Sequence, residues 1–261
     1  MKKYKYKKIN VIQIICFVTL VVGIIYISYY IQENYRTYKN NREIAKMFEN
    51  MSVENKTQLI ESNVMQYDVE RVLKVKELQK ENSEIVGWIE IENTNINYPL
   101  VQANDNNFYI THNYKKEKSK NGAIFVDKDY SFNLPSTNLL IYGHNNKNGT
   151  MFEELMKYKD EDFYKTHKTI RVTTLTDDFK YEIISVFLSR VYYKHEKDVF
   201  RYYYFVNANN QEEFNYYVEN SKKYSLYDTG KSAVYGDELL TLSTCEYSQV
   251  DGRLVVIAKK I

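Results

Sequence analysis

Leu239-Leu-Thr-Leu-Ser-Thr-Cys245 and, further along, Arg253-Leu-Val-Val-Ile-Ala258 decide the fold of this chain. Both runs are typical of β-strands, and the polar residues 246–252 between them are typical of a connecting loop. In this arrangement Cys245 lies directly opposite Arg253, at the end of the strand pair. Opposed residues project to the same side of a sheet, and side chains alternate along each strand. The core side therefore receives the apolar residues Leu240, Leu242, Val256 and Ala258.

The register of this strand pair also decides what surrounds Cys245. A slip by one residue would bury Arg253, so the register that leaves the arginine outside the core is favoured. The only other cysteine, Cys16, lies in an apolar run near the N-terminus. A chain exported to an oxidising compartment normally pairs its thiols or lacks them. An unpaired thiol beside a guanidinium therefore indicates a nucleophile, and a small buried apolar role is the alternative.

His144 is the candidate base for this thiol. It follows the strand-like run Asn138-Leu-Leu-Ile-Tyr-Gly and precedes the loop 145–149, so it lies where a strand ends, as Cys245 does. Loops at strand ends are where β scaffolds carry catalytic side chains. A solvated surface histidine is the alternative, and we expect surface positions for the other three, His112, His167 and His195. No pair of histidines has the spacing of metal ligands, so the sequence predicts no metal site.

Short β-rich runs alternate with turn residues from residue 85 onward, which favours a closed barrel or a sandwich. The eight runs cover residues 85–91, 96–101, 122–126, 138–142, 169–174, 180–188, 238–244 and 253–258. Two helices interrupt them. Thr150-Met-Phe-Glu153 has the form of a capping box, and residues 210–223 place Phe214, Tyr217 and Val218 on one face. About 180 residues can hold one core, so we expect one mostly-β (α+β) domain with peripheral helices.

Residues 11–31 predict a membrane span. They contain no charged residue, and about 20 apolar residues suffice for a helix to cross a bilayer. Five lysines among residues 1–8 precede the span, so the positive-inside rule predicts a cytoplasmic N-terminus and an extracellular body. A cleaved signal peptide is the alternative, but its apolar region is shorter and ends in small residues. We expect an uncleaved, single-pass anchor in the cell membrane.

The remaining sequence divides into two parts. Residues 32–81 are polar, lack Gly and Pro, and carry mixed charges, which predicts a helical stalk. Residues 82–261 then form the folded domain. The formal net charge of the whole chain is +2, which gives a nucleic-acid partner no electrostatic support.

Several motifs together resemble the signatures of sortases, the membrane-anchored cysteine transpeptidases of Gram-positive bacteria. They are Thr241-Leu-Ser-Thr-Cys245, Arg253 followed by Leu-Val-Val, and Tyr142-Gly-His144. The class B branch is resembled in particular by Ile85-Val-Gly-Trp-Ile, Tyr98-Pro, Gly122-Ala-Ile-Phe and a helix-bearing insertion between about residues 191 and 236. The resemblance covers residues 82–261, and the stalk matches only in type.

This resemblance implies an eight-stranded sortase barrel with Cys245 as nucleophile, His144 as general acid/base and Arg253 as oxyanion or substrate stabiliser. The substrate groove would be lined by Asn106, Tyr142, Ser243 and Glu246. Surface proteins with a C-terminal sorting signal such as Asn-Pro-x-Thr-Asn are the implied substrates. The implied acceptor is a peptidoglycan amine, and no cofactor is expected.

Two other functions remain open from the sequence. A plain cysteine endopeptidase shares the thiolate and the histidine but lets water resolve the thioester. A non-catalytic, membrane-tethered binding or scaffold protein would carry Cys245 as an inert, buried thiol.

Overall fold

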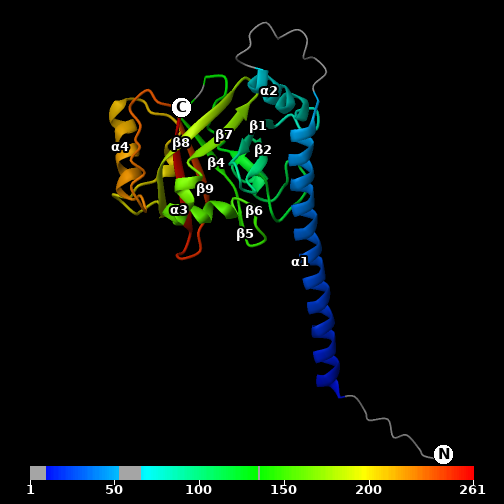
Figure 1. Ribbon diagram of the computed structural model, residues 1–261. Coiled ribbons are helices and arrows are strands. Elements are labelled where there is room, and N and C mark those ends of the chain that lie inside the picture. Colours follow the sequence, from blue (N-terminus) through cyan, green and yellow to red (C-terminus); the bar gives the residue numbers. More distant parts are fainter. Residues whose placement is uncertain (1–9, 53–65, 135) are drawn as a thin grey trace, which may run out of the picture. The chain divides into compact units, whose positions relative to one another are not determined.

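The computed structural model describes residues 10–52, 66–134 and 136–261 (Figure 1). The chain divides into two compact units, with the boundary between Glu43 and Ile44. The lysines of the predicted cytoplasmic tail and residues 53–65 of the predicted stalk lie outside the described residues. The predicted domain boundaries at residues 31 and 81 stay predictions.

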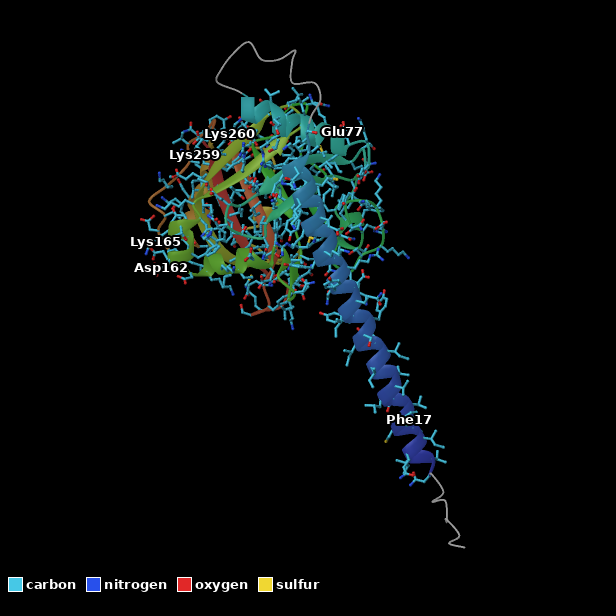
Figure 2. All side chains as sticks on the ribbon, turned by 45° about the vertical axis from the view of Figure 1, so that its right-hand side comes forward. Phe17, Glu77, Asp162, Lys165, Lys259 and Lys260 are labelled. Carbon is cyan, nitrogen blue, oxygen red and sulfur yellow. The ribbon has the colours of Figure 1, made fainter. Side chains whose placement is uncertain are left out.

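The first unit is the larger part of helix α1, Val11–Asn50. Apolar side chains such as Phe17 stand out from it on all sides in Figure 2, and they are solvent-exposed. Within the described part of the chain, α1 is the one helix long and apolar enough to cross a membrane. It continues without a break past Ile31, where the span was expected to end.

The second unit contains a closed barrel of eight strands, as predicted (Figure 1). Around the barrel the order is β1-β2-β3-β4-β9-β10-β8-β7, with parallel pairing only between β2 and β3 and between β4 and β9. The strands are β1 (Ile85–Glu90), β2 (Asn97–Val101), β3 (Ile124–Val126), β4 (Asn138–Tyr142), β7 (Thr169–Thr174), β8 (Asp178–Arg190), β9 (Leu239–Cys245) and β10 (Gly252–Lys260). A short hairpin of β5 (Asn145–Asn146) and β6 (Thr150–Met151) follows β4.

The predicted register of β9 and β10 is confirmed, with Cys245 opposite Arg253 and Leu242 opposite Val256. The inward residues of the two strands lie in the barrel core, including all four apolar residues predicted there. The outward residues Val255 and Ile257 are also buried, in a second cluster formed with the segment between β8 and β9. This strand pair is thus covered on both faces.

The helices lie around the barrel (Figure 1). They are α2 (Gln66–Leu78), α3 (Glu161–Thr166), α4 (Gln211–Lys223) and the 3-10 turns η2 (Phe108–Ile110), η3 (Glu153–Lys159) and η4 (Tyr202–Tyr204). In α4 the Asn210 side chain accepts a hydrogen bond from the Glu213 amide, at 2.9 Å, and so caps the helix. The predicted buried face of α4, with Phe214, Tyr217 and Val218, is confirmed.

The predicted capping box at Thr150 is wrong. Thr150 lies in β6, and its hydroxyl donates to the Asn148 side chain at 2.6 Å instead of capping a helix. The turn that follows is the 3-10 helix η3, whose N-cap Phe152 makes no side-chain cap bond. Because Phe152 is fully buried, core packing and not capping chemistry fixes where this turn begins.

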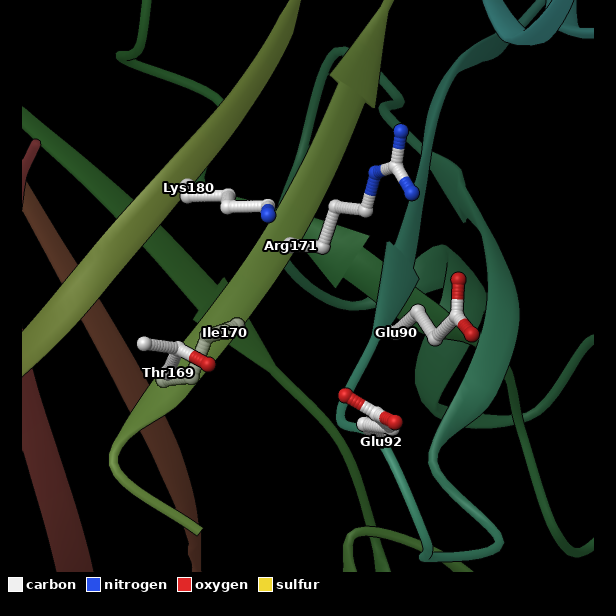
Figure 3. A pocket seen from close by; sticks show the side chains of 6 residues that line it. All are labelled: Glu90, Glu92, Thr169, Ile170, Arg171 and Lys180. Carbon is white, nitrogen blue, oxygen red and sulfur yellow. The ribbon is translucent and has the colours of Figure 1, made fainter. Parts of the chain in front are cut away.

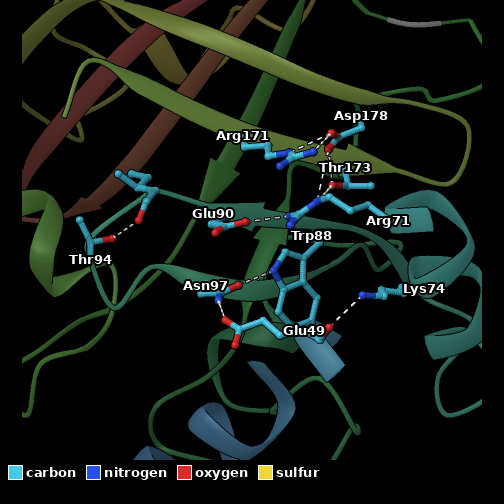
Figure 4. Close-up of polar contacts among 11 residues, drawn as sticks. Glu49, Arg71, Lys74, Trp88, Glu90, Thr94, Asn97, Arg171, Thr173 and Asp178 are labelled. Carbon is cyan, nitrogen blue, oxygen red and sulfur yellow. Dashed lines mark hydrogen bonds and ion pairs between the residues drawn. The ribbon is translucent and has the colours of Figure 1, made fainter. Parts of the chain in front are cut away.

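The end of α1 packs on the barrel within the second unit (Figure 4). The Phe48 ring stacks on Trp88 with 4.0 Å between centroids, and the Trp88 indole donates to Asn97 at 2.6 Å. Arg71 of α2 forms an ion pair with Glu90 of β1 at 2.9 Å and donates to the Thr173 hydroxyl at 3.1 Å. Stacking and partly buried ion pairing therefore hold α2 and the end of α1 on the face of β1 and β7.

Candidate active site

Cys245 is the last residue of β9, and its side chain is half-buried. It lies on the outward side of the strand, two residues beyond the buried Ser243, and its register partner is Arg253. The Ser243 hydroxyl is 2.7 Å from the phenolic oxygen of Tyr202, in the segment between β8 and β9. The thiol therefore lies at the point where the buried part of β9 ends and the loop 246–252 begins.

His144 lies beside Cys245 at the same end of the barrel. It follows β4, which runs parallel to β9, and the last pair of this ladder is Tyr142 opposite Ser243. The Thr244 hydroxyl donates to the Gly143 carbonyl at 2.8 Å, and the Asn145 amide side chain donates to the Cys245 carbonyl at 2.8 Å. Gly143 and Asn145, the two neighbours of His144, are thus hydrogen-bonded to Thr244 and Cys245. Because Arg253 is the register partner of Cys245, all three predicted catalytic residues lie at the same edge of the barrel.

The imidazole of His144 has a defined partner. Its Nε2 atom is 2.8 Å from the carbonyl oxygen of Ile110, the last residue of η2, and the ring is half-buried. This contact could not be predicted from the sequence, because any residue type can supply a backbone carbonyl as the acceptor.

The Arg253 guanidinium turns back onto its own loop. Its Nη1 atom donates to the carbonyls of Gly252, at 2.8 Å, and Asp251, at 3.1 Å. Burial raises the pKa of Tyr247, the charge of Cys245 adds to this effect, and the charge of Arg253 opposes it. Tyr247 therefore lies within electrostatic reach of both groups, and its hydroxyl donates to the Asn145 carbonyl at 3.1 Å.

Two of the predicted groove residues, Asn106 and Tyr142, meet on one carboxylate. The Asn106 amide and the Tyr142 hydroxyl donate to the same oxygen of Asp127, at 2.9 and 3.0 Å. Asp127 is buried, and burial together with this carboxylate raises the pKa of Tyr142. Sequence reasoning missed Asp127, whose only signal is that it directly follows an apolar strand.

The other two predicted groove residues, Ser243 and Glu246, are buried and have internal partners. Glu246 forms an ion pair with Lys159 at 2.5 Å and accepts from the Ser248 amide at 2.9 Å. Burial alone would raise the pKa of Glu246, but the hydrogen bonds from Lys159 and Ser248 outweigh it and hold this pKa below its usual range. Substrate contacts by these four residues remain predictions.

Two of the other histidines are not simply solvated, contrary to the surface prediction. The rings of His112 and His167 stack on Phe108 and Phe163, four residues earlier, at 4.1 and 4.0 Å. In each case Nδ1 also contacts the carbonyl of that phenylalanine, at 2.9 and 3.0 Å. Both rings therefore pack against the turn that precedes them, while His195 is exposed.

A pocket of about 340 Å³ lies elsewhere, on the face made by β1, β7 and β8 (Figure 3). Its lining is Glu90, Glu92, Thr169, Ile170, Arg171 and Lys180, none of which belongs to the predicted site. Among the described residues, no cluster of three or more His, Cys, Asp or Glu side chains could hold a metal ion.

Known proteins resemble this chain in fold and in sequence. The family profile of the sortase domain matches residues 89–261. Sortase B of Listeria monocytogenes is 35% identical over 189 residues, which cover 72% of this chain and 74% of that protein. Sortase B of Staphylococcus aureus is 30% identical over 186 residues, covering 70% and 73%. The crystal structure of sortase B from B. anthracis matches with a TM-score of 0.72 at 32% identity, covering 88% of this chain and 99% of that one.

The profile spans most of the chain and includes the region that carries Cys245, His144 and Arg253, and the solved structure has the same fold. Sortases of this branch are cysteine transpeptidases that anchor proteins to the cell wall. The chain belongs to the sortase family, as a member of class B.

Proposed function

We propose that Cys245 is the nucleophile of this sortase, His144 its general acid/base and Arg253 the group that stabilises the oxyanion or the substrate carbonyl. The observation that supports the proposal is that the three residues lie at the same edge of the barrel. Cys245 is the register partner of Arg253, and both neighbours of His144 are hydrogen-bonded to the end of β9. A thiol, an imidazole and a permanent cation at one rim are the groups that acyl transfer through a thioester requires.

The reaction begins when the Cys245 thiol gives its proton to His144 and the thiolate attacks a peptide carbonyl carbon. Arg253 stabilises the negative charge that develops on the carbonyl oxygen. As the C–N bond breaks, the His144 imidazolium returns the proton to the leaving amine and the thioester remains on Cys245. An acceptor amine then attacks the thioester, loses a proton to His144 and frees the thiol.

Arg253 has to exchange partners for this role. Its guanidinium rests on two carbonyls of the loop 246–252, and these neutral acceptors compete weakly with an oxyanion. A planar guanidinium presents its N–H donors in a rigid fork, which the compact ammonium group of a lysine lacks.

The substrates are proteins with a sorting signal, and we propose a pentapeptide similar to Asn-Pro-x-Thr-Asn. Asn106 and Tyr142 would contact it from the side of Asp127, and Ser243 and Glu246 would shape the floor near Cys245. We propose an amine of a peptidoglycan precursor as the acceptor.

We propose that residues 11–31 anchor the enzyme with a cytoplasmic N-terminus and that the body lies outside the cell. The apolar part of α1 and the lysines before it support this orientation. Protease added to intact protoplasts should remove the body and leave a small membrane fragment. Full protection of the body would contradict the orientation, and a mature N-terminus beyond Ile31 would indicate a cleaved signal.

Substitutions in the full-length protein in detergent micelles test the three roles. Cys245→Ala should abolish cleavage of a sorting peptide, and His144→Ala should lower kcat by roughly a hundredfold or more because the leaving amine loses its proton donor. Arg253→Lys should also cause a large loss, because it keeps the charge but lacks the fork. Cys16→Ala is the matched control and should leave turnover unchanged. Normal turnover in Cys245→Ala would refute the proposal.

A further inference from the structure

We propose that the carbonyl of Ile110 and the bare α-carbon of Gly122 position His144, so that Nε2 always keeps its proton and Nδ1 is the nitrogen that exchanges protons. The inference rests on the proposed catalytic role of His144. It assigns each ring nitrogen a task and names two residues outside the strands as parts of the catalytic support.

The contact with Ile110 fixes the tautomer. A carbonyl oxygen can only accept a hydrogen bond, so at 2.8 Å from it the Nε2 atom of His144 must carry a hydrogen. Neutral His144 therefore has its lone pair on Nδ1. Within residues 66–134 and 136–261, no protein group hydrogen-bonds this Nδ1 atom. Nδ1 is left as the atom that can take a proton from a thiol and give it to an amine.

Gly122 makes this contact sterically possible. Its φ of +60° lies in the left-handed region, and its α-carbon packs against both the acceptor and the ring. A Cβ at this position would lie 2.8 Å from Cδ2 of His144, 2.9 Å from the Ile110 carbonyl oxygen and 2.6 Å from that of Tyr109. Any side chain at residue 122 must therefore push the imidazole and its acceptor away from their present positions.

The position of the Ile110 carbonyl is stabilised by the hydrogen bonds of its neighbour Tyr109. The neighbouring Tyr109 is buried, and its hydroxyl donates to Glu84 at 2.6 Å and accepts from the Asn82 amide at 2.9 Å. The Tyr109 carbonyl accepts from the amide of Ala123 at 2.9 Å. Side-chain and backbone bonds thus fix η2 to the start of β1 and to the strand after Gly122, so the acceptor for His144 has little freedom to move.

The proton path follows from this geometry. The thiol proton of Cys245 goes to Nδ1, which leaves an imidazolium whose other ring proton stays on Nε2, hydrogen-bonded to the Ile110 carbonyl. The S–C bond forms, the peptide C–N bond breaks, and the Nδ1 proton passes to the leaving nitrogen. The Nε2 proton takes no part, and the bond to Ile110 keeps the ring in one orientation through both half-reactions.

Histidine-selective ¹⁵N NMR on the full-length protein in detergent micelles tests the tautomer directly. The chain contains four histidines, so the spectrum holds four ring systems, and that of His144 is identified by its loss in His144→Gln. At high pH the neutral ring should show the proton on Nε2 and the lone pair on Nδ1. A neutral ring protonated on Nδ1 would overturn the inference. This readout requires no turnover, so it stands apart from the test of the proposed function.

Gly122→Ala tests the support, and Gly230→Ala is the matched control. Gly230 has a similar φ of +68°, but a Cβ there meets no heavy atom within 4 Å. Both substitutions place an alanine in the left-handed region, with the same backbone cost. Only the new Cβ in Gly122→Ala clashes with His144 and with the Ile110 carbonyl. We expect Gly122→Ala to lower kcat by on the order of tenfold to a hundredfold with little change in KM, and Gly230→Ala to leave both unchanged.

The two variants also give a spectroscopic comparison. The His144 ring signals should shift in Gly122→Ala and stay in place in Gly230→Ala. Equal kcat for wild type and a folded Gly122→Ala would refute the positioning role of Gly122. If Gly122→Ala does not fold, the wild-type tautomer still decides the inference. A wild-type enzyme that forms no thioester would instead refute the proposed function.

Discussion

Glu246 directly follows the proposed nucleophile, and its carboxylate holds the loop between β9 and β10 in place. The carboxylate binds Lys159 from η3 and both the amide and the hydroxyl of Ser248. With only 4% of its surface exposed, Glu246 supports the end of β9 from inside the protein. Glu246 can thus influence the surroundings of Cys245 through the loop that it holds in place.

Glu246→Gln should destabilise the protein in a pH-dependent way. The folded-state pKa of Glu246 lies below the unfolded value of about 4.3, so the ionised carboxylate contributes stability above that pH, and this is lost as the pH falls through the folded pKa. We expect a loss of about 1 kcal/mol at pH 7 that shrinks as the pH falls through the folded-state pKa of Glu246. Thermal unfolding across this range measures it, and the exposed Glu219→Gln on α4 is the control. A pH-independent difference would contradict the account.

The proposed catalytic residues and the groups that position them differ in how far the sequence predicts them. Cys245 and Arg253 could be paired because alternation within two apolar strands fixes their register, and a slip would bury a charge. His144 could be added because it ends a strand. The contacts of Ile110, Gly122 and Asp127 could not be found this way, because they depend on where loop backbones and buried side chains turn in space.

At the scale of elements, the end of α1 is an integral part of the folded unit. Phe48 is 2% exposed, lies flat on Trp88 and belongs to a cluster with Val75 and Leu78 of α2. Burial lowers the pKa of the nearby Arg71, and the charge of Glu90 opposes this effect. Apolar stacking and paired charges therefore hold the same face of the barrel.

Phe48→Ala should destabilise the protein strongly. It removes a buried ring from a stacked pair, and losses of this kind cost about 3–5 kcal/mol. Thermal unfolding of the full-length protein in detergent measures the effect. Tyr35→Ala, which removes an exposed aromatic side chain of the same helix, should leave the midpoint unchanged. Equal midpoints for the two variants would show that the end of α1 adds nothing to the fold.

The elements also show where sequence patterns stop being sufficient. The eight barrel strands could be predicted because each is a short β-rich run between turn residues, and α4 because its apolar residues fall on one face. The hairpin of β5 and β6 and the turn η3 were not predicted, because Thr150 and Glu153 have the spacing of a capping box. The burial of Phe152 determines the local structure instead. The packing of Phe48 on Trp88 joins residues far apart in sequence, which no local pattern reports.

At the scale of the whole molecule, the chain combines an apolar helix with a sortase barrel of class B. Sortases are cell-surface enzymes, and in the proposed orientation the anchored enzyme would meet both its protein substrates and lipid-linked wall precursors at the membrane. The central claim is that the barrel joins the two through a thioester on Cys245.

Mass spectrometry of the full-length protein incubated with an Asn-Pro-x-Thr-Asn peptide tests this claim most directly. The account predicts an acyl adduct on Cys245 that is absent in Cys245→Ala and is converted to an amide product when an amine nucleophile is added. Free acid as the only product, with no response to the amine, would indicate a hydrolase. A Cys245 that neither alkylates nor forms an adduct with any peptide of a sorting-signal library would contradict the account.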